Sequence, residues 1–243
     1  MTRAHRQPLL WVLWLCAFAL GSAAAQPEIH NPADQPRSAD EAALKEPRQI
    51  AAAVIGADGY SPRSIVQVGA HHGEFLEVFL ERFPAARGLW TEPNNSEQNL
   101  PAAKARLARF GDRVDYHYGC ADRDISDGCV PGNTDVILTD WVSILQDLAG
   151  MRKIYRLAAA QLAPGGWLVN IDRAGFADPD WARRIEAARA GIRPAHEAPP
   201  VHHPEYRTPT SDEQLQAMRA AGLDAKVLWQ SLNTVLIMAR KPL

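Results

Sequence analysis

Short apolar runs that alternate with helix-like stretches are the feature that most restricts the fold of this chain of 243 residues. Five runs of strand length follow one another, at residues 65–68, 88–90, 114–118, 136–138 and 167–171. Between them, apolar residues recur at helical spacing over 75–83 and over 148–162, which Asp147 can cap and Pro164-Gly165-Gly166 can end. Strands that alternate with helices predict a mostly parallel sheet with helices on both faces.

The end of the chain departs from this alternation. Residues 211–221 are predicted to form a helix that stops at Gly222, and residues 225–230 and 234–239 are predicted to be strands. The link at 231–233 is too short for a crossover, so the two strands must form an antiparallel hairpin. We therefore expect an α/β fold whose seven-stranded, mostly parallel sheet ends in a C-terminal antiparallel hairpin.

The first 25 residues have a pattern of their own. Basic residues stand at the start, an almost wholly apolar run covers residues 8–20, and the small residues Ala23 and Ala25 precede Gln26. This order is typical of a secretory signal peptide, and the run is short for a membrane span. We predict that residues 1–25 are cleaved and that the protein is periplasmic or secreted. An uncleaved anchor is the alternative, and it too leaves the domain outside the cytoplasm.

The rest of the chain is predicted to be a polar lead-in followed by one domain. In the lead-in, residues 26–60, the part 26–45 is expected to be mobile and 46–57 can form a short helix. Residues 61–243 are expected to be a single domain, because their length suits one core. The formal net charge of −2 gives no reason to expect a nucleic acid as partner or, beyond the N-terminal anchor, a membrane.

Two cysteines, Cys120 and Cys129, remain once the signal peptide is removed. An exported chain with an even number of cysteines predicts a disulfide between them. Two buried free thiols are the alternative.

A glycine turn and an acidic residue mark the predicted ligand site. The first strand runs into a turn from Gly69 to Gly73, and Glu92 ends the second strand. In open α/β sheets, ligands bind at the carboxyl ends of the strands, where a glycine-rich turn lets the backbone approach them. The two glycines do not have the G-x-G-x-x-G spacing of a dinucleotide site, which argues against a nicotinamide cofactor.

Five segments resemble the Rossmann-like class I methyltransferases, which use S-adenosylmethionine (SAM). Residues 66–75 resemble motif I, 83–92 the second strand with its ribose-binding acid, 110–119 the third strand, 162–167 the L-x-P-G-G turn, and 220–223 the turn before the final hairpin. The resemblance covers about residues 62–241. The turn Gly69-Ala70-His71, with Glu92 downstream, also resembles that of FkbM-type methyltransferases.

The resemblance implies a set of cofactor-binding residues. They are Gln67, Gly69, Ala70, His71, Gly73, Glu92, Cys120, Ala121 and Asp122. Three of these positions depart from the family pattern. Gln67 stands where an Asp is usual, His71 replaces a glycine, and Cys120 replaces an Asp that would accept from the adenine amino group.

The fourth strand is followed by Asp140 and Trp141, where the methyl donor of such an enzyme meets its substrate. Asp140 is the candidate catalytic residue, able to orient or deprotonate a substrate heteroatom, and Trp141 could wall the pocket. A helix cap and a core aromatic are the alternatives. His202 and His203 lie in an insertion expected to cover the substrate side, or are exposed loop residues. With no acid or cysteine at metal-ligand spacing, no metal is expected.

The function implied by this resemblance is SAM-dependent methyl transfer to a small-molecule substrate, by a protein exported from the cytoplasm. A non-catalytic SAM- or nucleoside-binding or interaction protein on a degenerate methyltransferase fold is the alternative. It is favoured by the substitutions at Gln67, His71 and Cys120, and the retained Glu92 argues against it. A cytoplasmic protein with a later start would need a start codon other than Met, since no Met lies between Met1 and Met151.

Overall fold

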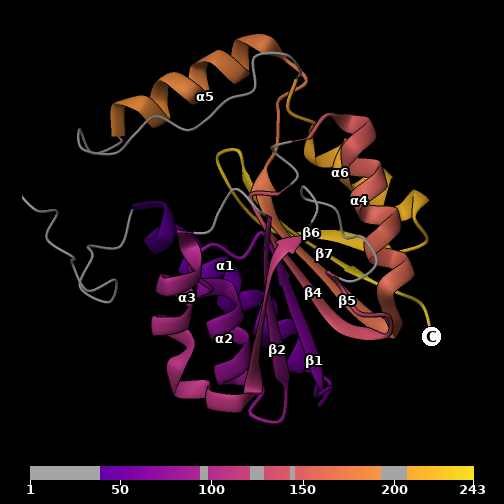
Figure 1. Ribbon diagram of the computed structural model, residues 1–243. Helices are drawn as coiled ribbons and strands as arrows, with labels where there is room; N and C mark the ends of the chain where they lie inside the picture. Colours follow the sequence, from indigo (N-terminus) through magenta and orange to yellow (C-terminus); the bar gives the residue numbers. More distant parts are fainter. Residues whose placement is uncertain (1–38, 94–97, 121–128, 143–145, 193–206) are drawn as a thin grey trace, which may run out of the picture. The chain divides into compact units, whose positions relative to one another are not determined.

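Seven strands form one sheet in the computed structural model, which describes residues 39–93, 98–120, 129–142, 146–192 and 207–243. Their order across the sheet is β3-β2-β1-β4-β5-β7-β6 (Figure 1). The strands are β1 (Ser64–Val68), β2 (Arg87–Pro93), β3 (Val114–Cys120), β4 (Thr134–Asp140), β5 (Leu162–Arg173), β6 (Asp224–Ser231) and β7 (Thr234–Arg240). The strands β1 to β5 are parallel to one another, and β7 is antiparallel to both β5 and β6. The predicted fold class is confirmed.

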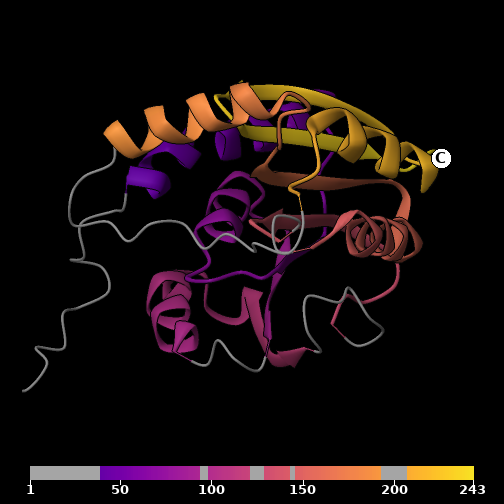
Figure 2. The same cartoon turned by 90° about the horizontal axis from the view of Figure 1, so that it is seen from above.

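Helices cover both faces of this sheet. They are α1 (Ala39–Gly56), α2 (Glu74–Arg82), α3 (Asn99–Leu107), α4 (Leu148–Gln161), α5 (Pro179–Ile192) and α6 (Ser211–Ala220), with the 3-10 segment η2 (Ala108–Arg113) after α3. Figures 1 and 2 show the strands between α2 and α3 on one side and α4 on the other. Successive strand residues enter opposite cores: Leu138 packs in the core with α1, α2 and α3, and Ile137 in the core with α4 and α6.

The helix α1 begins earlier than the sequence predicted. It starts at Ala39, inside the stretch expected to be mobile, and continues through Pro47. Its residues Leu44, Ala51 and Ile55 are at most 2% exposed and belong to the same core as α2. Burial of this apolar face against the domain stabilises a segment whose local composition is polar.

The strand β5 also differs from the prediction at its start. Asp147 caps α4 as expected, accepting a hydrogen bond from the Gly150 amide at 2.7 Å. The helix ends at Gln161, and the Pro164-Gly165-Gly166 segment lies within β5 rather than before it. The pairing of β4 with β5 shifts register there, so the Pro-Gly-Gly segment is accommodated as an irregularity in the ladder.

The helix α5 lies beyond the carboxyl ends of the central strands (Figure 1). It belongs to the segment that the sequence predicted as an insertion on the substrate side, and most of its residues are exposed. No helix within the described ranges is long and apolar enough to cross a membrane. The predicted signal peptide, residues 1–25, lies outside the described residues.

Candidate functional site

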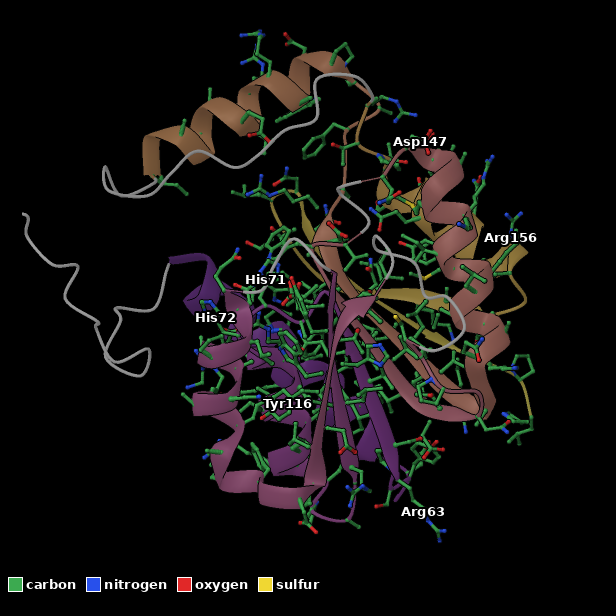
Figure 3. All side chains as sticks on the ribbon, viewed as in Figure 1. Arg63, His71, His72, Tyr116, Asp147 and Arg156 are labelled. Atoms are coloured by element: carbon green, nitrogen blue, oxygen red, sulfur yellow. The ribbon has the colours of Figure 1, made fainter. Side chains whose placement is uncertain are left out.

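The turn between β1 and α2 lies at the carboxyl end of the sheet. Figure 3 shows His71 and His72 there, far from Arg63, which precedes β1 at the opposite end. Gly69, His71 and Gly73 have φ angles of 63°, 44° and 82°, so the chain is left-handed at three positions of one short turn. Such a turn reverses the backbone within a few residues and begins α2 at its far side.

The two glycines of the turn are required for space as well as for backbone shape. A Cβ on Gly69 would lie 2.9 Å from the Val142 side chain, and one on Gly73 would lie 2.8 Å from Leu107. His71 occupies the left-handed region without such crowding, because its side chain is exposed. The turn therefore accommodates the non-glycine residue that departs from the family pattern.

Glu92, at the end of β2, lies directly against this turn. It is 2% exposed, and its Oε1 accepts a hydrogen bond from the backbone amide of His71. Two more bonds tie the turn to β2: the Ala70 amide donates to the Thr91 carbonyl at 3.1 Å, and Trp90 Nε1 donates to the His71 carbonyl at 3.0 Å. The structure thus brings together the turn and the acid that were predicted as one site.

Gln67 is engaged in the start of α2. Its side chain is buried, and its Oε1 accepts a hydrogen bond from the Leu76 amide at 2.8 Å. Gly73, the N-cap residue, has no side chain to satisfy the first amides of the helix, and Gln67 satisfies one of them from the neighbouring strand. Its amide therefore has a structural partner, and contact with a cofactor stays a prediction.

Asp140, at the end of β4, forms an ion pair that the sequence did not predict. The Arg48 guanidinium of α1 donates from Nη2 to Asp140 Oδ2 at 2.5 Å, and the two side chains are 8% and 4% exposed. Burial raises the pKa of Asp140, and the charge and hydrogen bond of Arg48 oppose that rise. No local pattern marks Arg48, because its partner lies 92 residues away along the chain.

Trp141 and Arg173 extend the site toward α5. Trp141 is left-handed, with φ of 57°, and the Arg173 guanidinium lies 5.1 Å from its ring centroid. Arg173 also lines a cavity of about 180 Å³, together with Glu186 of α5 and Asn233 of the hairpin link. Arg173 therefore contacts both Trp141, which was predicted to form a wall of the substrate pocket, and this cavity.

Several predicted site residues cannot be placed in this geometry. Ala121, Asp122, His202 and His203 lie outside the described residues, and so does the side chain of Cys120. Cys129 is 5% exposed and is disulfide-bonded. Its pairing with Cys120 stays a prediction. Within the described part of the chain, no three His, Cys, Asp or Glu side chains are grouped to hold a metal ion.

Comparison with known proteins identifies the fold. No family model and no curated protein sequence matches the chain significantly. Among solved structures, an O-methyltransferase family protein from Burkholderia thailandensis is 18% identical with a TM-score of 0.61, and the match covers 84% of this chain and 58% of that one. Human N-acetylserotonin methyltransferase, in complex with SAM, is 15% identical with a TM-score of 0.58, over 84% and 53% of the two chains. This chain has the class I methyltransferase fold.

The methyltransferase fold occurs here in a chain that spans little more than half the length of those two proteins. A third solved structure, described as a possible exported protein from Bordetella parapertussis, is 15% identical with a TM-score of 0.61. That match covers 85% of this chain and 71% of the other. At these identities the likeness establishes the fold alone.

The residues at the turn have the chemistry that SAM would require. Glu92 can accept hydrogen bonds from ribose hydroxyls, since a carboxylate is acceptor-only. On the β4 side, Arg48 Nε and Asp140 Oδ1 are buried atoms with no hydrogen-bond partner among the described residues. One is a donor and the other an acceptor, as the carboxylate and ammonium groups of an amino acid need. The hydrogen-bonding groups of Glu92, Arg48 and Asp140 therefore fit the cofactor that the fold implies.

Proposed function

We propose that this protein is a SAM-dependent methyltransferase that acts on a small-molecule substrate and is exported from the cytoplasm. The observation that carries the proposal is the placement of Glu92. In the class I methyltransferase fold, its buried carboxylate lies against the left-handed glycine turn at the carboxyl end of β1. This edge of an open α/β sheet is where such folds bind ligands.

When bound, SAM supplies an electrophilic methyl group on a sulfonium. The protein's part is to hold the two reactants in line and to exclude water, and positioning of this kind can supply much of the acceleration. Glu92 would hold the ribose and the glycine turn would contact the cofactor through its backbone, while Trp141 and Arg173, which lie against each other, would border the substrate side. A small-molecule substrate agrees with the N-acetylserotonin named for the human protein of the same fold.

Asp140 is better suited to binding than to proton abstraction. Its Oδ2 is held by Arg48 at 2.5 Å, and a proton on either oxygen would neutralise the carboxylate and leave the buried guanidinium without its counter-charge. We therefore include a binding role for Asp140 in place of the predicted catalytic one. Methyl transfer from a sulfonium does not require a strong base when the acceptor atom is already nucleophilic.

A non-catalytic binding protein is the second candidate. It is favoured by Gln67, whose amide serves α2 where the family has an acid, and by the side chain at His71. The two functions differ in turnover and share cofactor binding. A protein that binds SAM and never releases S-adenosylhomocysteine when supplied with phenolic, amine and thiol acceptors would favour the second.

Export is proposed from the signal-peptide pattern of residues 1–25, with a membrane anchor as the alternative. The fold shared with a protein described as a possible exported protein supports it. Mass spectrometry of the protein from a native cell envelope should show a chain that begins at Gln26. An intact amino terminus in the soluble cytoplasmic fraction would refute export.

The decisive experiment for cofactor use is calorimetry of residues 26–243 with SAM and with S-adenosylhomocysteine. We expect saturable binding of both at a stoichiometry of about one, as for a single site at the glycine turn. A folded protein that binds neither compound at millimolar concentration would refute the proposal.

A further inference from the structure

The ion pair between Arg48 and Asp140 joins two parts of the chain at the proposed site. Arg48 belongs to α1, ahead of the first strand, and Asp140 is the last residue of β4. Both side chains are more than nine-tenths buried. Because one cation and one anion are buried together, the pair brings no net charge into the interior.

The pair leaves hydrogen-bonding capacity unused. Within the described residues, Arg48 Nε and Asp140 Oδ1 have no partner, although both atoms are buried. A buried polar atom without a partner destabilises the folded protein, and a buried ion pair is itself weak support for a fold. A ligand that offers an acceptor to the guanidinium and a donor to the carboxylate would satisfy both atoms at once.

The position of the pair connects it to the glycine turn. Thr139 is in register with Val68, the residue before Gly69, so Asp140 lies beside the start of the turn. The Arg48 guanidinium is 5.7 Å from the ring of Phe75, in the first turn of α2. Because β2 and β4 flank β1, Glu92 and the ion pair lie on opposite sides of the turn.

We propose that Arg48 and Asp140 bind the amino-acid end of the cofactor, the guanidinium taking the α-carboxylate and the Asp140 carboxylate taking the α-ammonium. A zwitterion suits a neutral ion pair, because each of its charges finds the opposite charge and no net charge is buried. The assignment rests on the proposed function. It makes Arg48, from a segment before the core fold, a residue that selects ligands by their amino-acid group.

The test compares two nucleosides that differ in this group. S-adenosylhomocysteine contains the amino acid, and 5′-methylthioadenosine lacks it while retaining the adenine, ribose and sulfur. Calorimetry would measure both affinities in wild type, Arg48→Met, Asp140→Asn and the control Lys45→Met, which removes an exposed charge from the same helix. The ratio of the two affinities within one variant does not depend on how much of the sample is folded.

For Arg48→Met we expect the S-adenosylhomocysteine affinity to fall at least about tenfold, the loss of one charge-assisted hydrogen bond. The affinity for 5′-methylthioadenosine should change less than about twofold, because this nucleoside lacks the amino-acid group that Arg48 is proposed to contact. Asp140→Asn should act in the same direction, and Lys45→Met should change neither affinity.

Other outcomes would overturn the assignment. Equal losses for the two nucleosides, or no loss for either, would show that the pair only attaches α1 to the sheet. If Arg48→Met cannot be obtained folded, Asp140→Asn gives the same comparison, since asparagine matches aspartate in shape. Failure of wild type to bind either nucleoside would instead refute the proposed function, and with it this inference.

Discussion

Replacing Glu92 with alanine should weaken SAM binding and loosen the glycine turn. The carboxylate is proposed to accept hydrogen bonds from the ribose hydroxyls, and bonds to a charged acceptor contribute about 1.5–3 kcal/mol. The expected loss of affinity is therefore about 10- to 150-fold. Enthalpy should account for much of it, because the change removes polar contacts and little apolar surface.

The structure adds a second effect of the same substitution. Glu92 Oε1 accepts from the His71 amide, so alanine leaves that amide without its acceptor. The exposed position of His71 lets water replace part of the bond, and the cost to folding should be about 1 kcal/mol, at the lower end for a lost partner. Glu92→Gln is the matched control, because it keeps an acceptor for the amide and removes the charge.

Calorimetry with SAM and urea unfolding of the free protein separate the two effects. Glu92→Ala should show both, whereas Glu92→Gln should keep near-wild-type stability and lose only part of the affinity. Unchanged SAM affinity in a folded Glu92→Ala protein would show that the cofactor does not bind at this turn.

Three further predictions concern stability. Cys120→Ser/Cys129→Ser should cost about 2–3 kcal/mol through the unfolded state, and thiol counting under denaturing, non-reducing conditions should find none free in mature protein; two free thiols would contradict the bridge. The Arg207 guanidinium lowers the pKa of Glu213 from 4.5 to about 2, so the stabilisation by this pair is present above pH 4.5 and is lost as the pH falls toward 2. The urea midpoint of Glu213→Gln should therefore depend less on acid pH than that of wild type, and an equal dependence would show that this pair does not cause the loss of stability in acid. Gln67→Leu should destabilise by about 1–3 kcal/mol because an amide of α2 loses its acceptor, while Gln67→Glu should largely restore it; a neutral effect of leucine would deny the capping role.

The sequence was informative wherever a short segment determines its own structure. The apolar runs predicted the strands, because a buried strand needs few residues and has no helical period. The hairpin followed from the length of the link at 231–233, because so short a link can join two strands only in antiparallel orientation. The turn at Gly69 and the acid at Glu92 could be assigned to one site because neighbouring parallel strands end at the same edge.

What the sequence could not predict depends on contacts between distant residues. Arg48 stands in a segment whose polar composition suggested a lead-in, and only its contact with Asp140 reveals it. The extent of α1 was missed for the same reason, since its helix is stabilised by burial of residues such as Ile55. The Pro-Gly-Gly segment was expected to precede β5, because local rules assign proline and glycine to turns and not to irregular strands.

The place of β7 has a consequence for the timing of folding. This strand comes last among the described elements, yet it lies inside the sheet between β5 and β6, and six of its seven residues are buried. Until it has left the ribosome, β5 has an open edge and β6 has no neighbour. The segment that forms β7 must therefore be synthesised before the sheet can close, and closing it requires slow contacts between distant segments.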